Sequence, residues 1–243
     1  NRDFIHACAQ PVKGSPIPHK FATWSAISAV AGALGRKCWF SMPNYDVRPN
    51  LFIVLVGPPG TNKSVSLILP FSKVFSKLTT PVGTKEDDDE FNSGLTQYGL
   101  KTYPLYLIQD KITPEKLAME MHKTTRLDYR VGTVRDGLFY DSSITMTTSE
   151  FGTFMSRHYQ YLQMFMTDMW DSKESYSHQI KTGASQFIKG PCLNWIACAT
   201  PQQFIDHLPE DAASQGLLSR FLPIYHEGER IPQSLLQEKV SDD

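Results

Sequence analysis

The feature that most constrains the fold of this chain is a run of six apolar residues, 51–56 (LFIVLV), with a glycine- and proline-rich segment directly after it. A continuous apolar run of this length is typical of a strand that is buried on both faces of a parallel sheet. The residues from 63 onward predict a helix, with a kink or break near Leu69 because Pro70 lacks a backbone N–H. The order of strand, glycine-rich loop and helix indicates an α/β fold.

The loop between that strand and that helix, residues 57–64, reads GPPGTNKS and resembles the pattern G-x-x-x-x-G-K-[ST]. In this pattern, backbone N–H groups and the start of the helix surround the phosphates of a nucleotide. Asn62 replaces the second glycine, and we expect the loop to keep its shape because Asn adopts left-handed backbone angles readily. The alternative is a turn that matches the pattern by chance. The expected nucleotide-binding residues are Gly57, Pro58, Pro59, Gly60, Thr61, Asn62, Lys63 and Ser64.

ATP and Mg²⁺ are the expected cofactors. Lys63 would reach the β- and γ-phosphates, and the Ser64 hydroxyl would coordinate Mg²⁺. Glu150 follows the strand candidate 144–148, and open α/β sheets bind their ligands at the carboxyl ends of the strands. We therefore expect Glu150 to polarise the attacking water and to contribute to the Mg²⁺ site. The alternative is a surface carboxylate, and Asp110 is a second acidic candidate that is less favoured because an edge strand lies farther from the phosphates.

Two further residues are candidates for the catalytic machinery. Thr200 ends the strand candidate 192–199, where a polar side chain would sense the γ-phosphate or hold the water. Its alternative role is the N-cap of a helix that begins at Pro201, and the two roles are compatible. Arg220 lies in an otherwise apolar stretch, so its charge requires a partner. It is either an arginine finger for the nucleotide of a neighbouring subunit or a member of a structural ion pair.

The remaining segments predict an α/β fold with a mainly parallel, five-stranded sheet flanked by helices. We expect a helical lead-in at 1–48 that is irregular over its first 18 residues, a core at 49–228 and a polar tail at 229–243. Residues 80–104 are interpreted as a solvated loop and residues 123–141 as basic and irregular. The expected strands are 37–42 (short), 51–56, 105–109, 144–148, 192–199 and 221–225, and the expected helices are 19–35, 113–122, 153–170 and one from Pro201.

Composition excludes several classes of protein. The net charge of −1 argues against a generally basic protein that coats nucleic acid, although it leaves room for a basic patch in a pore. The apolar runs are too short to span a bilayer. The cysteines have no zinc-site spacing, and we expect reduced thiols, with Cys192 and Cys198 packing as small apolar residues. The chain begins at Asn1, and we interpret it as part of a longer, cytoplasmic protein of bacterial, phage or mobile-element origin.

Five segments in this order resemble the P-loop ATPase domain found beside primase domains in phage, plasmid and mobile-element replication proteins. That family is similar to AAA+ ATPases and superfamily 3 helicases. The similarity covers roughly residues 15–226. It implies Lys63 and Ser64 as the Walker A pair, Glu150 as the Walker B acid, Thr200 as the sensor and Arg220 as the finger. The segments are 57–64 (GPPGTNKS), 113–117 (TPEKL), 148–152 (TSEFG), 194–201 (NWIACATP) and 216–221 (GLLSRF).

The resemblance implies an AAA+/RecA-like, homo-oligomeric, hexameric motor that hydrolyses ATP and acts on DNA. Ser149 stands where many such enzymes have Asp, so the metal shell departs from the family pattern. Single-stranded DNA in a central channel needs basic and aromatic side chains, and the alternative for such residues is a solvated face with aromatics in the core. An oligomeric NTPase switch or defence protein that acts on a protein partner, and a non-catalytic nucleotide-binding scaffold, are the competing functions. The candidate DNA contacts are Arg157, His158, Tyr159, Tyr161, Lys173, Tyr176, Lys181 and Lys189.

Overall fold

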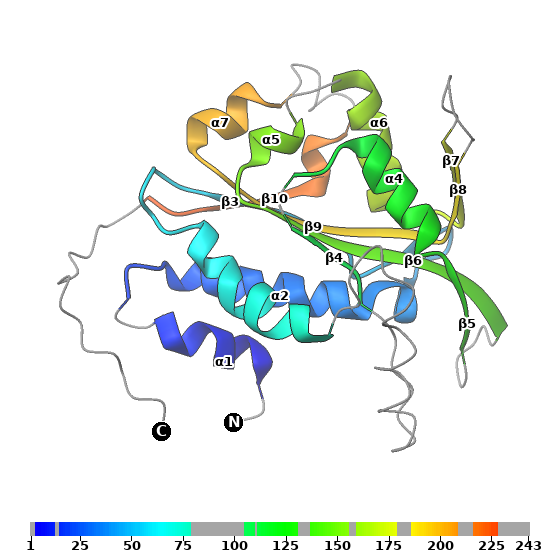
Figure 1. The fold of residues 1–243 in the computed structure, drawn as a ribbon, viewed down its shortest axis with the longest axis horizontal. Coiled ribbons are helices and arrows are strands. Elements are labelled where there is room, and N and C mark those ends of the chain that lie inside the picture. The colour runs from blue at the N-terminus through cyan, green and yellow to red at the C-terminus, as the bar shows by residue number, and fades with distance from the viewer. Residues whose placement is uncertain are drawn as a thin grey trace.

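A mainly parallel β-sheet forms the centre of the computed structural model (Figure 1). The structure describes residues 3–12, 15–78, 105–109, 111–130, 137–155, 159–178, 186–208 and 216–227. The predicted α/β class with helices flanking a mainly parallel sheet is therefore confirmed. The order across the sheet is β10 (Phe221–Tyr225), β3 (Phe52–Val56), β9 (Pro191–Ala199), β6 (Gly137–Thr148) and β4 (Leu107–Gln109), all parallel, with β5 (Arg126–Arg130) antiparallel to β6 as a sixth strand.

Helices cover both faces of this sheet, as expected for parallel strands that are buried on both sides (Figure 1). One face carries α4 (Pro114–Lys123), α5 (Phe151–Met155), α6 (Tyr159–Asp171) and α7 (Pro201–Asp206). The other face carries α1 (Phe4–Ala9), α2 (His19–Leu34) and a helical segment at 64–78.

Strand β3 contributes to the core on both faces. Phe52, Val54 and Val56 belong to the cluster under α4, α5 and α6. Ile53 and Leu55 belong to the cluster under α2 and the segment 64–78. This alternation follows from the two-residue period of a strand, and it explains why the sequence is apolar at every position of the strand.

Of the kink or break predicted near Leu69, the break is absent, because the helical path continues through Pro70 with a change of helix type. The segment consists of a 3₁₀ turn at Ser64–Leu67, a π-helical stretch at Ile68–Val74 and a 3₁₀ turn at Phe75–Leu78. Pro70 lacks the N–H that an α-helix would bond to the carbonyl four residues earlier. A change of helical pitch accommodates the missing donor without interrupting the segment.

Several other segments carry more structure than the sequence predicted. In the expected irregular lead-in, α1 begins where the Asp3 carboxylate accepts hydrogen bonds from the N–H groups of Ile5 and His6. Part of residues 123–141 forms the antiparallel ribbon of β5 and the start of β6. The expected helix 153–170 is two helices, α5 and α6. The short strand expected at 37–42 is β1 (Phe40–Ser41), which pairs with an unpredicted β2 (Asp46–Val47), and a second unpredicted hairpin joins β7 (Ser175–His178) with β8 (Gln186–Lys189).

The predicted helix ends are confirmed at three positions. The Thr113 hydroxyl accepts a hydrogen bond from Lys116 N at 3.3 Å and caps α4. Thr200 caps α7. Gly35 ends α2 with a φ of +48°, an angle that glycine adopts without strain. The solvated loop expected at 80–104 and the polar tail at 229–243 lie outside the described residues.

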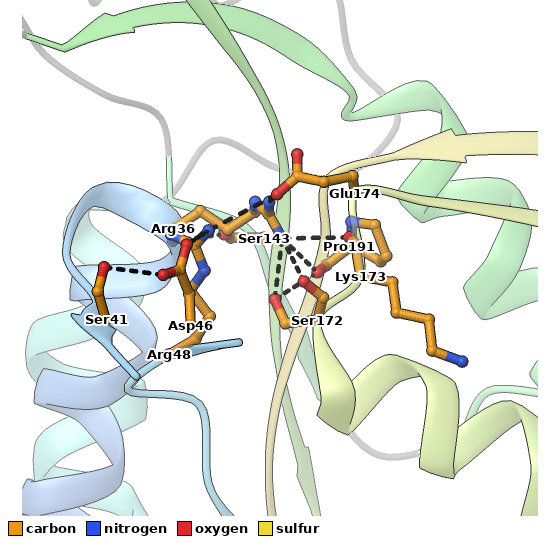
Figure 2. A network of polar contacts seen from close by, with 9 residues as sticks. All are labelled: Arg36, Ser41, Asp46, Arg48, Ser143, Ser172, Lys173, Glu174 and Pro191. Carbon is orange, nitrogen blue, oxygen red and sulfur yellow. Dashed lines mark hydrogen bonds and ion pairs between the residues drawn. The ribbon is translucent and has the colours of Figure 1, made fainter. Parts of the chain in front are cut away.

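A buried arginine holds the amino-terminal ends of the central strands to the helices around them (Figure 2). The Arg36 side chain is fully buried just after α2. Its Nη1 donates to Ser172 O at 2.7 Å and to Pro191 O at 3.3 Å, and its Nη2 pairs with Glu174 at 2.9 Å. Arg36 therefore joins the end of α2, the turn after α6 and the start of β9.

We predict that Arg36→Ala lowers the free energy of unfolding by about 3 kcal/mol, because it leaves buried carbonyl groups unpaired and removes a buried side chain. Glu174→Ala is the control, since the Glu174 side chain is 79% exposed and the exposed half of an ion pair contributes less than about 1 kcal/mol. Urea denaturation followed by circular dichroism measures both. Equal losses in the two variants would contradict a structural role for the buried hydrogen bonds of Arg36.

Candidate functional site

In the loop 57–64, which leaves the carboxyl end of β3, Asn62 has the left-handed backbone that the sequence predicted. Asn62 has a φ of +52° and Gly60 a φ of +81°, so both lie in the left-handed region. Asn tolerates this region better than most residues with a side chain, which explains how it stands in place of glycine. A Cβ on Gly57 would lie 3.0 Å from Thr61 Oγ1 and 3.1 Å from His226 O, so the close packing of the loop favours glycine there.

The Lys63 side chain turns back into this loop. Its Nζ donates to Gly57 O and Pro58 O, both at 2.8 Å, and to Thr61 Oγ1 at 3.2 Å. Burial lowers the pKa of Lys63, while the neighbouring Cys198 thiol acts in the opposite direction. Burial raises the pKa of Cys198 to about 12, so this thiol is a core group, as predicted. The ammonium group thus lies in the concave side of the loop, and the Ser64 side chain is exposed next to it.

The strand register brings Gly57, Thr200 and Glu150 to one edge of the sheet. Val56 pairs with Ala199, so Gly57 and Thr200 come next on neighbouring strands. Thr148 pairs with Ala197, which places Glu150, two residues later, at a similar level. One strand, β9, lies between β3 and β6, which are therefore about 10 Å apart.

The chain leaves β3 and β9 toward opposite faces of the sheet. The segment 64–78 follows β3 on one face, and α7 follows β9 on the other (Figure 1). In open α/β sheets, such a change of direction between neighbouring strands marks the place where ligands bind.

A cavity of about 460 Å³ lies on the Glu150 side of this edge. It is lined by Lys111, Thr148, Ser149, Glu150 and Thr153, and the described residues of the loop 57–64 do not line it. The Thr153 hydroxyl donates to Glu150 Oε2 at a long 3.4 Å. The loop 57–64 and the cavity are therefore neighbouring parts of one edge, with the end of β9 between them.

Lys111 is a cavity residue that sequence reasoning missed. The sequence could have indicated Lys111, because this residue lies two positions after the strand candidate 105–109, at the carboxyl edge of the predicted sheet. Asp110, the acidic candidate at the same strand end, lies outside the described residues.

Thr200 has the N-cap role that the sequence left open. Its Oγ1 accepts a hydrogen bond from Gln203 N at 3.2 Å, and the Gln203 side chain accepts one from Thr200 N at 3.2 Å. This reciprocal pair is a capping box that fixes the start of α7. Thr200 is half-buried beside the end of β9, and its role as a sensor of phosphate stays a prediction.

Arg220 forms the ion pair that was the structural alternative for it. Its Nε and Nη2 donate to Asp171 Oδ1 at 3.1 and 2.7 Å, its Nη1 donates to Gly216 O at 2.8 Å, and the guanidinium lies 5.3 Å from the centre of the Trp170 ring. Arg220 precedes β10, whose first residue pairs with Phe52. It therefore lies about 17 Å along the sheet from the loop of its own chain. A role at a nucleotide requires a neighbouring subunit and stays a prediction.

The candidate DNA contacts divide into three groups. Arg157, His158 and Lys181, together with the side chains of Tyr159 and Tyr161, lie outside the described residues. Lys173 forms an ion pair with Asp168, which raises the pKa of Lys173, and the Tyr176 ring packs edge-on against Phe165 at 5.7 Å. Lys189 lies over the Tyr140 ring at 4.2 Å, on the hairpin of β7 and β8.

The part of the chain that the structure describes has neither a cluster of metal-binding side chains nor a helix suited to crossing a membrane. No group of three or more His, Cys, Asp or Glu side chains is arranged there to hold a metal ion. No helix there has the length and apolar character that crossing a membrane requires. A comparison of the sequence with protein-family models and with curated proteins finds no match. Its function is therefore inferred from its residues and their geometry.

We predict that Asn62→Val destabilises the chain by about 1–2 kcal/mol, because a β-branched residue is strained at a positive φ. Asn62→Gly is the matched variant, and we expect it to change stability by less than about 1 kcal/mol because glycine adopts the same angle freely. Chemical denaturation of the two variants and the parent measures the difference. A loss for glycine as large as that for valine would show that the left-handed angle is not what the site requires.

Proposed function

We propose that this chain binds ATP through the loop 57–64 and hydrolyses it with Glu150 orienting the attacking water. The observation that carries the proposal is the left-handed Asn62 in a loop that follows a fully buried parallel strand. Gly60 has the same kind of backbone angle, and Lys63 Nζ lies within the concave side of the loop. Loops of this kind, placed between a strand and a helical segment, are typical phosphate-binding sites.

The side chains present fit a Mg²⁺ ion shared with the nucleotide. Mg²⁺ takes few protein ligands when phosphates and water complete its octahedral shell. Ser64, with an exposed hydroxyl at the end of the loop, and Glu150, with an exposed carboxylate at the end of β6, are the residues that would hold it. When bound, the ion would neutralise charge that develops on the phosphate oxygens.

Each proposed residue has a distinct task in the reaction. Lys63 exchanges its contacts with the Gly57 and Pro58 carbonyls for charge-assisted hydrogen bonds to phosphate oxygens. Glu150 accepts a hydrogen bond from water, whose oxygen attacks the γ-phosphorus while the bond to the β–γ bridging oxygen breaks. The proton leaves toward the carboxylate, and ADP and inorganic phosphate are the products. Thr200, at the end of the strand between these two residues, contacts the γ-phosphate or the water.

We further propose that the active form is a homo-oligomer, a hexamer by its resemblance to ring ATPases. Arg220 lies at the amino ends of the strands, whereas the loop 57–64 lies at their carboxyl ends. A contact between Arg220 of one copy and the loop of another therefore joins two different surfaces. Such a head-to-tail contact repeats around a closed ring rather than in a two-fold dimer. Each nucleotide would then receive Arg220 from the next subunit.

Single-stranded DNA in the central channel of such a ring is the proposed substrate, and the chain is then a helicase or translocase domain of a replication protein. Lys189 and Tyr140 support this part of the proposal, because they pair a positive charge with an aromatic ring beside the β7–β8 hairpin. Both kinds of group are used to hold a single strand.

We predict that the chain hydrolyses ATP and that single-stranded DNA stimulates the rate. Lys63→Ala abolishes nucleotide binding, whereas Glu150→Gln retains it and lowers kcat about a hundredfold or more, because only the water-orienting group is lost. Lys73→Ala and Glu115→Gln change exposed residues of the same types outside the site and serve as controls. Steady-state phosphate release and titration with a fluorescent ATP analogue measure the two quantities.

The outcomes separate the proposed function from its competitors. Hydrolysis that ignores DNA but responds to a protein partner would favour the oligomeric NTPase switch. Binding without hydrolysis in the parent would favour a nucleotide-binding scaffold. Equal affinity for ATP in the parent and Lys63→Ala would contradict the assignment of the loop.

We predict that Arg220→Ala and Lys63→Ala are each inactive alone and that mixing them in equal amounts restores up to about one quarter of the parent rate, since a head-to-tail ring then contains intact interfaces. Asp171→Asn is the control for stability, because it weakens the same ion pair and keeps the arginine. Absence of any recovery in re-assembled mixtures would contradict the role of Arg220 in a neighbouring subunit.

A further inference from the structure

Trp195 holds the chain on both sides of Glu150. Its side chain, in the middle of β9, is the largest fully buried one among the described residues. The indole Nε1 donates a hydrogen bond to Thr148 Oγ1 at 3.0 Å. The ring stacks on Phe151, with 5.5 Å between ring centres and 10° between ring planes. Thr148 and Phe151 flank Ser149 and Glu150, so one side chain contacts both ends of the segment that carries the carboxylate.

The position of Trp195 is itself fixed by aromatic neighbours. Phe154, from α5, meets the indole edge-on at 5.2 Å. Phe221 of β10 lies at 5.7 Å and Phe52 of β3 at 6.0 Å, both also edge-on. Because interiors are close-packed, the ring has no room to tilt without moving strands on either side. Trp195 therefore transmits the rigidity of the sheet to the residues around Glu150.

Helix α7 supports the same segment from another side. Phe204 packs against Phe151 at 5.4 Å. The His207 ring lies so close to Gly152 that a Cβ there would be 2.6 Å from Nε2. The start of α5 is thus enclosed by Trp195, which lies in β9, and by α7, which follows β9.

We infer that Trp195 is a positioning residue that sets the place of the Glu150 carboxylate through Thr148 and Phe151. The inference rests on the proposed role of Glu150 in ATP hydrolysis. Glu150 is exposed and the hydrogen bond from Thr153 is long, so its side chain is placed mainly by the backbone that carries it. A displacement of about 1 Å in a catalytic group lowers a rate about a hundredfold, which makes a fixed backbone at 148–151 necessary.

The test compares Thr148→Val with Thr148→Ser. Valine keeps the shape of threonine and removes the acceptor of the indole N–H, whereas serine keeps the acceptor. We expect kcat for ATP to fall about tenfold or more in Thr148→Val and much less in Thr148→Ser, with the KM and the dissociation constant for ATP within about twofold of the parent because the loop 57–64 is unchanged. Thr147→Val is the matched control, since Thr147 is also buried in β6 and points to the other face of the sheet.

Trp195→Phe and the double variant Trp195→Phe/Thr148→Val give an independent test. Phenylalanine keeps a ring against Phe151 and removes the N–H. If the hydrogen bond is what positions Glu150, the double variant loses no more kcat than either single variant, because the two changes remove the same interaction. If the effects multiply, the two residues act separately and the inference is wrong.

The results also distinguish this inference from the proposed function. A Thr148→Val variant that matches Thr147→Val in kcat overturns the positioning role of Trp195 and leaves the ATPase intact. A parent chain without ATP turnover overturns both. Loss of ATP affinity in step with kcat would show general destabilisation and would likewise contradict a positioning role. Should Thr148→Val fail to fold, Trp195→Phe, which leaves no buried donor unpaired, carries the same comparison of kcat with ATP affinity.

Discussion

The parallel pairing of β9 between β3 and β6 is the constraint on which the rest of the structure depends. Every residue of β9 is buried, so the strand has no exposed face and must lie in the interior of the sheet. Its register with β3 and β6 brings three strand ends to one edge. The loop 57–64, Thr200 and the segment that carries Glu150 follow those ends directly. The spacing between the loop and Glu150 is therefore the spacing of strands rather than a property of flexible connections.

Polar groups inside the sheet region fix how the helices lie on this frame. The Asn194 side chain accepts a hydrogen bond from Leu51 N at 3.1 Å and donates one to Ser28 O at 3.0 Å. Asn194, in β9, is thus bonded both to α2 and to the residue directly before β3. Arg36, just after α2, likewise bonds to the turn after α6 and to the start of β9. Buried polar groups that are bonded in this way favour one packing of the helices over others, because a shift breaks their hydrogen bonds.

The charged groups of the chain are separated along the strands. Arg36 lies beside the amino end of β9, and Arg220 directly precedes β10. Both side chains are held by carbonyl and carboxylate oxygens of the chain. Lys63, at the carboxyl ends, is held by loop oxygens alone among the described contacts. An ammonium group held by neutral acceptors can exchange them for an anion at little loss, whereas the buried Arg36 guanidinium is enclosed by acceptors of its own chain.

Local patterns in the sequence determined the central strand at 51–56, the left-handed backbone of Asn62 and the helix ends at Gly35, Thr113 and Thr200. Each depends on residues within a few positions of one another, so propensity and capping chemistry are sufficient. The sequence did not predict the polar hairpin of β7 and β8, because such ribbons carry no continuous apolar run.

Contacts between distant residues were decided only by the tertiary structure. The Asp171 partner of Arg220 lies 49 residues away, and the Thr148 partner of Trp195 lies 47 residues away. The sequence left an ion pair and a finger open for Arg220, and it gave no sign that a core tryptophan would flank Glu150. The sequence by itself determined which side chains are candidates for the proposed chemistry. Their placement relative to one another depends on strand register and close packing, which bring together residues that no local pattern relates.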